Sequence, residues 1–209
     1  MVSDDASRFT LSSELLRQVE ALGQKQALFP SPAGAIDEIV QQLEDINPIS
    51  CPLQPNHLSS LLGTWQLIYA SRGTSVTRTL ASYSTFWEVV KIKQIWQTLV
   101  TSGVHRILAS NNILLDFSLL GEWQLGANGV WTWGEDQLSA KVSFNSFSLQ
   151  ARELFSLPSW SLPELKIPVW EFFQNEALWT TSYLDQNIRV GRGATGNLFV
   201  FRRKWELTK

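Results

Sequence analysis

The sequence has little of the chemistry that catalytic or metal-binding proteins commonly use, with one cysteine, Cys51, and two histidines, His57 and His105. A single cysteine excludes an intrachain disulfide framework and fits a reducing compartment. The two histidines are far apart in the chain and show no metal-ligand spacing. No base or positive charge stands beside Cys51 to form a thiolate. The composition therefore predicts a protein that is not an enzyme and that holds no metal and no cofactor.

The sequence also lacks an excess of charge and a long apolar run. A formal net charge of −2 over 209 residues argues against nucleic-acid binding, which favours a basic surface. No apolar run reaches the roughly 18–20 residues that a membrane span requires. The first residues contain Asp4 and Asp5 and no apolar core, so we expect neither a secretory signal nor an Arg-rich transit peptide. These absences predict an intracellular globular protein.

Tryptophan, in contrast, is abundant: the chain has ten, against one methionine. Large rigid rings in such excess favour a broad apolar interior, an apolar ligand, or both. Hydrophobic residues make up 44% of the chain, which is ample for one core.

The N-terminal zone has helical periodicity. We expect disorder over residues 1–10 and a helical extension over residues 11–47, packed on the domain that follows. The first apolar stripe comprises Leu11, Leu15, Val19 and Leu22, and the second comprises Ile36, Ile39, Val40, Leu43 and Ile46. Ser31 and Pro32 resemble an N-cap and first helical residue, and Pro48 ends the second stripe. A partner-binding or membrane-surface role for these helices is the alternative.

From Gly63 onward the hydrophobic period changes to two. About eight to ten short strands with short connections are expected between residues 63 and 206. This pattern favours a mainly β fold, an up-and-down antiparallel barrel that closes on itself. A barrel of about eight strands has an interior that side chains fill or that holds one small ligand.

Two details of this zone are predicted separately. Gly126–Gly129, between two short apolar segments, indicates a hairpin turn. In residues 138–149 the apolar phase runs through Phe144 and then shifts by one to Phe147, which indicates a β-bulge.

The C-terminal segment contains the pattern G-x-G-x-x-G at Gly191, Gly193 and Gly196. A dinucleotide site would need a helix after these glycines, then another strand and an acidic residue about 20 positions on. Only thirteen residues follow Gly196, and they alternate as a strand does. The glycines therefore indicate the turn of a closing hairpin.

Three segments resemble the PAP/fibrillin family, also called plastid lipid-associated proteins. Residues 42–73, QLEDINPISCPLQPNHLSSLLGTWQLIYASRG, resemble the family's opening signature. Residues 180–203, TTSYLDQNIRVGRGATGNLFVFRR, resemble its closing signature, and residues 156–173 resemble its proline-rich approach to the last hairpin. The resemblance implies a lipocalin-like barrel without known general catalysis, associated with thylakoid membranes or lipid globules and with prenyl lipids or carotenoids. Together with the missing transit peptide, it implies a cyanobacterial member or a processed plastid form.

The candidate site follows from the alternation and from this resemblance. The predicted ligand-binding residues are Trp65, Leu67, Tyr69, Trp123, Trp131, Phe199 and Arg203, and the predicted structural-motif residues are Gly63, Tyr183, Asp185, Arg189, Arg192, Gly193 and Gly196. The lipocalin likeness implies that Trp65 closes one end of the barrel under a stacked arginine. Arg203 is either that cation–π cap or a donor to a ligand's carbonyl or carboxylate. Asp185 and Arg189 are expected to form an ion pair or a turn cap.

Three functions remain open from the sequence. The first is a carrier that binds a quinone such as plastoquinone, a carotenoid or an acyl lipid in the barrel. The second is a structural coat or scaffold protein with a filled barrel, docked on lipid through Leu157, Trp160, Leu162 and Leu165. The third is a bilin lyase or chaperone on a similar barrel.

Overall fold

The computed structural model describes residues 2–29, 34–74, 77–78, 90–118, 120–135, 137–153, 163–168 and 177–205. Three helices come first: α1 (Val2–Leu28), α2 (Ala35–Asp45) and α3 (Leu58–Leu61). The strands are β1 (Gly63–Ala70), β2 (Val90–Thr101), β3 (Arg106–Phe117), β4 (Gly121–Thr132), β5 (Ser139–Glu153), β6 (Leu165–Pro168), β7 (Ala177–Leu184), β8 (Ile188–Gly193) and β9 (Leu198–Arg203).

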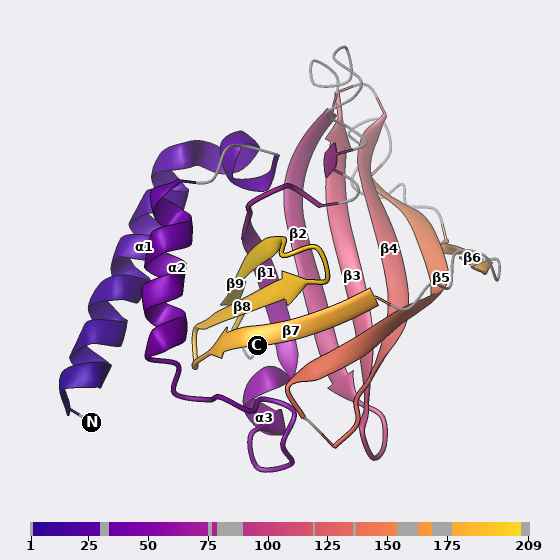
Figure 1. The fold of residues 1–209 in the computed structure, drawn as a ribbon. Helices are drawn as coiled ribbons and strands as arrows, with labels where there is room; N and C mark the ends of the chain where they lie inside the picture. The colour runs from indigo at the N-terminus through magenta and orange to yellow at the C-terminus, as the bar shows by residue number, and fades with distance from the viewer. Residues whose placement is uncertain are drawn as a thin grey trace.

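The strands form one antiparallel sheet that closes on itself (Figure 1). Consecutive strands pair from β1 to β5, and β5 continues through β7, β8 and β9 back to β1. The short strand β6 pairs with β5 alone among the described strands and branches from the ring. The predicted fold, a lipocalin-like antiparallel barrel after N-terminal helices, is confirmed in this near-barrel form.

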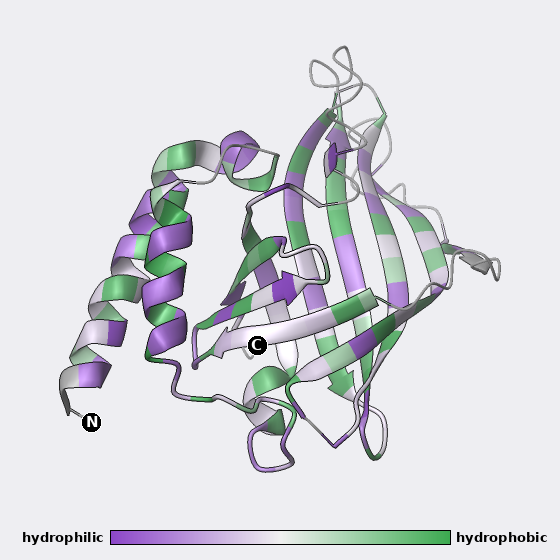
Figure 2. Ribbon diagram, in the orientation of Figure 1, coloured by the Kyte–Doolittle hydropathy of each residue, from purple (hydrophilic) through white to green (hydrophobic). Residues whose placement is uncertain are grey.

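The ring closes fully only at the end where β1 begins. Of the 12 residues of β2, only Trp96–Leu99 pair with β1, and of the 15 residues of β5, only Ser139–Val142 pair with β7. The long wall β2–β5 therefore extends well past the short strands β7–β9. Along that wall hydrophobic and hydrophilic residues alternate (Figure 2), as expected for strands with one face inward.

The core consists of two clusters on opposite faces of the sheet. The inner cluster, inside the ring, includes Trp65, Ile107 and Trp131. The outer cluster lies between the helices and the outer faces of β1, β7, β8 and β9, and it includes Leu15 and Val40. The helices α1 and α2 lie side by side on this flank (Figure 1), so both predicted amphipathic stripes pack on the barrel.

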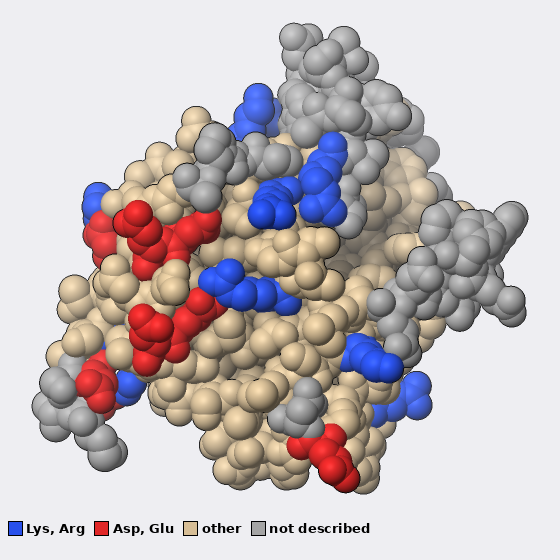
Figure 3. Space-filling view, viewed as in Figure 1, with Lys and Arg blue, Asp and Glu red and all other residues tan. Residues whose placement is uncertain are grey.

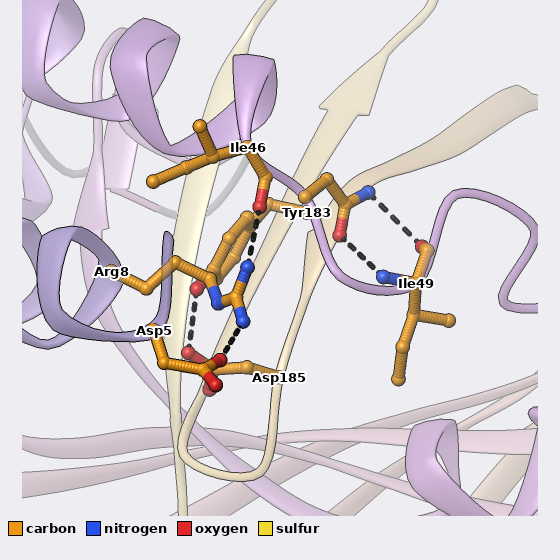
Figure 4. Close-up of polar contacts among 7 residues, drawn as sticks. Asp5, Arg8, Ile46, Ile49, Tyr183 and Asp185 are labelled. Atoms are coloured by element: carbon orange, nitrogen blue, oxygen red, sulfur yellow. Dashed lines mark hydrogen bonds and ion pairs between the residues drawn. The ribbon is translucent and has the colours of Figure 1, made fainter. Parts of the chain in front are cut away.

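The helices differ from the prediction at their N-terminal ends. Helix α1 begins at Val2, so residues 2–10 are helical and the expected disorder is wrong for them. Arg8 explains part of this order, because it donates a hydrogen bond to the Ile46 carbonyl (3.3 Å) and pairs with Asp5 (Figure 4). Helix α2 begins at Ala35 with Gly34 as its N-cap. The predicted cap at Ser31 and Pro32 lies outside the described residues.

A kink at Gly23 directs the end of α1 toward the barrel. Gly23 has φ 70° and ψ 160°, a backbone region that glycine enters without steric cost. After the kink, Gln24 Nε2 donates to the Lys93 carbonyl (3.2 Å) and Leu28 joins the inner cluster with 2% exposure. The last turn of α1 therefore packs where β1 and β2 separate.

The predicted hairpin at Gly126–Gly129 is wrong, because β4 runs unbroken through these residues. The two glycines allow β5 to approach β4 closely. A Cβ at Gly126 would lie 2.3 Å from Ser148 Oγ, and one at Gly129 would lie 2.4 Å from the Ser143 carbonyl oxygen. The predicted bulge in β5 is confirmed, since the register with β4 shifts between Asn128 and Gly129.

The closing hairpin is confirmed. Strands β8 and β9 pair antiparallel from Ile188–Arg202 to Arg192–Leu198. Gly196 lies in the connecting turn with φ +74°, a left-handed conformation that favours glycine.

Candidate ligand-binding site

The closed end of the barrel is built around Trp65. Its ring is fully buried, and its Nε1 donates to the Leu61 carbonyl of α3 at 2.8 Å. The Arg203 guanidinium lies 4.0 Å from the ring centroid. Arg203 donates to the carbonyl oxygens of Leu62 (2.9 Å), Gln186 (2.8 Å) and Ser60. These contacts engage all three nitrogens of the guanidinium, so the geometry supports the cation–π cap over the ligand-donor interpretation.

Tyr69 lies on the opposite face from the one predicted. The β1–β9 register shifts between Leu67 and Tyr69, so a bulge intervenes at Ile68. Leu67 stays in the inner cluster, while Tyr69 joins the outer cluster under α2. Its hydroxyl lies 3.4 Å from Asp37 Oδ1, and burial is the main cause that raises the pKa of Tyr69 to about 12. Tyr69 therefore does not line the interior.

Above the closed end, aromatic rings pack against one another at tilted angles inside the barrel. Trp179 lies 5.7 Å from Trp131 and 5.4 Å from Phe199, measured between ring centroids. A Cβ on Gly191 would lie 1.9 Å from Trp179 Cζ2, so only glycine there leaves room for this indole. Trp131 and Phe199 were predicted as lining residues, but Trp179 was missed.

The long wall continues this apolar lining past these rings. Trp123 pairs with Leu115 of the inner cluster, and Leu125 pairs with Ile113, so both face inward by register. Both are half-buried. Phe147, which pairs with Ala127 in the same inward phase, is 43% exposed. The lining is therefore sealed at the closed end and partly open along the wall.

A charged residue lies inside the barrel between these regions. Arg189 is fully buried, and its Nη2 donates to Gln97 Oε1 at 2.6 Å. Gln97 Nε2 in turn donates to Asn111 Oδ1 at 2.7 Å. The Arg189 guanidinium lies 4.2 Å from the Phe201 ring centroid and 5.1 Å from that of Trp65. Burial, with a smaller effect of Arg203, lowers the pKa of Arg189 to about 9.

The prediction for Asp185 and Arg189 is half correct. Asp185 caps its turn, because Oδ1 accepts hydrogen bonds from the backbone N–H groups of Asn187 (2.7 Å) and Ile188 (2.6 Å). The Tyr183 hydroxyl donates to Asp185 Oδ2 at 2.6 Å (Figure 4). Arg189 points into the barrel and forms no ion pair with Asp185.

The remaining predicted motif residues connect the barrel to the helices and to its closed end. Arg192 forms a bidentate pair with Glu44 of α2, in which Nε donates to Oε1 at 2.8 Å and Nη2 donates to Oε2 at 2.7 Å. Figure 3 shows this pattern more widely, with acidic side chains over the helices and basic ones over the adjoining strands. Gly63 opens β1 with φ +114°, and a Cβ there would lie 3.1 Å from Arg203 Nη1. Gly193 faces Trp179 across the β7–β8 pair.

Besides Trp179, sequence reasoning missed that the Arg189 side chain lies in the interior. In the segment NIRVGR the apolar Ile188 and Val190 suggest an inner face, which would place Arg189 outside. Helices cover β8 from outside, so Ile188 and Val190 belong to the outer cluster and Arg189 faces inward. Gly191 and Gly193 lie on the same face of β8 as Arg189. Two small residues on one face of a strand indicate that this face is crowded, and this pattern could have placed Arg189 in the interior.

Two other kinds of feature are absent from the described residues. None of the described helices is long and apolar enough to cross a membrane. Within the same residues, no group of three or more His, Cys, Asp or Glu side chains could hold a metal ion.

The chain resembles known proteins over nearly its whole length. The PAP_fibrillin family model matches residues 11–202. A curated relative from Arabidopsis thaliana, "Probable plastid-lipid-associated protein 8, chloroplastic", is 25% identical over 200 residues, which cover 93% of this chain and 72% of the relative. No solved structure is significantly similar. Since the family model spans the helical extension and every strand of the ring, the chain belongs to the PAP/fibrillin family.

Proposed function

We propose that this protein binds an apolar lipid, with an isoprenoid or acyl chain, inside its barrel and without catalysis. The observation that carries the proposal is the half-open inner wall, where Phe147 remains 43% exposed although it faces the same side as the buried core. Covering an apolar side chain in such a position with lipid removes its surface from water and therefore lowers the free energy. Family membership and the name of the Arabidopsis relative support the same class of ligand.

The expected gain in binding free energy grows with the length of chain that the wall covers. Each buried methylene contributes about 0.8 kcal/mol, so about ten methylenes along the wall contribute about 8 kcal/mol before the costs of association. The aromatic cluster of Trp131, Trp179 and Phe199 lies beside that wall, and Trp179 and Phe199 are only half-buried.

The test compares two arginine substitutions at similarly exposed positions. Phe147→Arg places a charge on the inner wall, whereas Leu178→Arg places one on the outer face of β7, where Leu178 is 49% exposed. Binding of a C20 isoprenoid alcohol and a C16 alcohol is followed by tryptophan fluorescence. We expect the Phe147 variant to lose affinity at least ten-fold and the Leu178 variant to keep it. Equal affinities in both variants would place the lipid outside the barrel.

Peripheral attachment to a lipid surface is a second candidate, which a separate observation favours. Val100, Val104 and Leu108 form an exposed group at the β2–β3 hairpin, which we term the hairpin patch, with exposures of 52%, 88% and 43%. Val100 and Leu108 are cross-strand partners. We propose that this patch docks on a thylakoid or plastid lipid surface. Of the predicted docking loop, Leu165 is 59% exposed, and Leu157, Trp160 and Leu162 lie outside the described residues.

A further inference from the structure

The interior of the barrel contains buried hydrogen-bond donors without acceptors. Arg189 has Nε and Nη1 without a partner, and Nη2 alone is bonded, to Gln97. The indole Nε1 atoms of Trp131 and Trp179 are also buried and without a partner. The Arg189 guanidinium lies 5.9 Å from the Trp131 ring centroid, and the two indole ring centroids are 5.7 Å apart, so the side chains that carry these donors form one cluster.

Such a cluster is costly unless something accepts its hydrogen bonds. A buried donor left unpaired costs about 1–3 kcal/mol, and more if it is charged. Within the described part of the chain, Arg189 forms no ion pair with a carboxylate, and the charge that acts on it is the positive Arg203. Apart from Gln97 Oε1, the described residues therefore offer this cluster neither an acceptor oxygen nor a negative charge.

We propose that Arg189 binds the carboxylate of a long-chain carboxylic acid, with its chain lying along the inner wall. A carboxylate supplies two acceptor oxygens and one negative charge, and the planar guanidinium fork matches it in a bidentate pair. The indole N–H groups of Trp131 and Trp179 are the additional donors beside it. From Trp131 to Leu125 the inner face of β4 spans about 20 Å, a length similar to that of an extended C16 chain.

This inference rests on the proposed function, since it names the head group of the lipid that the barrel binds. The probes are a C16 carboxylate and the C16 alcohol of the same length, titrated against the full chain by calorimetry. A charge-assisted contact predicts that the wild type binds the acid about ten- to hundred-fold more tightly than the alcohol. Arg189→Met should abolish this preference, because it keeps an unbranched side chain of similar length without donors.

Arg192→Gln is the matched control, since Arg192 lies on the same strand but contacts Glu44 on the outer side. It should leave the preference for the acid unchanged. Thermal unfolding of the ligand-free protein separates binding from support of the fold. Removing an uncompensated buried charge should leave Arg189→Met as stable as the wild type or more so. A merely structural arginine would instead lower the melting temperature in that variant.

The outcomes are distinguishable from failure of the proposed function. Equal binding of acid and alcohol by the wild type would leave lipid binding in place and overturn the carboxylate site. Binding of neither probe would overturn both proposals. If Arg189→Met does not fold, the ratio of the affinities of the wild type for the acid and the alcohol still tests the carboxylate site. Arg189→Lys, which keeps the charge but loses the planar guanidinium, should retain only part of the preference for the acid.

Discussion

Removing the Arg203 side chain is the most informative test of the closed end. Arg203 donates to the carbonyl oxygens of Ser60, Leu62 and Gln186, and its guanidinium lies 4.0 Å from the Trp65 ring centroid. Three hydrogen bonds at about 1 kcal/mol each and a cation–π contact of about 1 kcal/mol sum to about 4 kcal/mol. Because the side chain is half-buried, water replaces part of these contacts after truncation.

We therefore expect Arg203→Ala to lower the free energy of unfolding by about 2–3 kcal/mol, or the melting temperature by about 4–12 °C. Circular dichroism at increasing temperature or urea concentration measures the loss. Arg202→Ala is the control, since the neighbouring Arg202 is exposed and, among the described residues, has only a distant ion pair with Glu20, at 3.9 Å. It should cost less than about 0.5 kcal/mol. Equal stability of the two variants would refute the assignment of Arg203 as the cap of the closed end, and a loss of lipid affinity with unchanged stability would make it a ligand donor.

Three further predictions concern separate parts of the molecule. Gly191→Ala should lower the free energy of unfolding by about 1–3 kcal/mol, because its Cβ would overpack against Trp179. Gly193→Ala should lower it less, because its Cβ would meet no atom closer than 3.9 Å. Equal losses of stability in urea unfolding would exclude crowding as the cause. The pKa of Tyr69 is raised from 10.0 to about 12, so this phenol stabilises the fold below pH 10, and its contribution is lost as the pH rises toward 12. Tyr69→Phe should therefore lose less stability than the wild type between about pH 10 and 12. An identical dependence of stability on alkaline pH in the two proteins would contradict the assigned burial. If the hairpin patch docks on lipid, high salt should release little protein from membranes and mild detergent most of it, whereas complete release by salt would indicate electrostatic docking.

The sequence was sufficient for features that depend on local periodicity. The two amphipathic stripes, the change to period two at Gly63 and the strand that follows Gly196 predicted the helices, the barrel and its closing hairpin. The phase slip after Phe144 also predicted a bulge correctly, because a strand that keeps one face buried must shift its pattern where a residue is inserted.

The errors arose where a contact between distant segments decides the outcome. The bulge at Ile68 moves Tyr69 to the outer face, and its apolar neighbours give no sign of this, since β1 is buried on both faces. Gly126 and Gly129 permit close approach of β5, a demand that the local sequence cannot distinguish from a turn. Arg189 faces inward because the helices cover the outer face of β8, where Ile188 and Val190 are buried. The residues of the strand alone do not show that its outer face is covered.

The most direct test of the central claim, that the barrel binds an apolar lipid, is the lipid content of the protein purified from its native host without detergent. Mass spectrometry of an organic extract should find an isoprenoid or acyl lipid in about one-to-one ratio with the wild-type chain, and much less with Phe147→Arg expressed in the same host. An extract without stoichiometric lipid from wild-type protein would contradict the claim and favour a barrel filled by its own side chains.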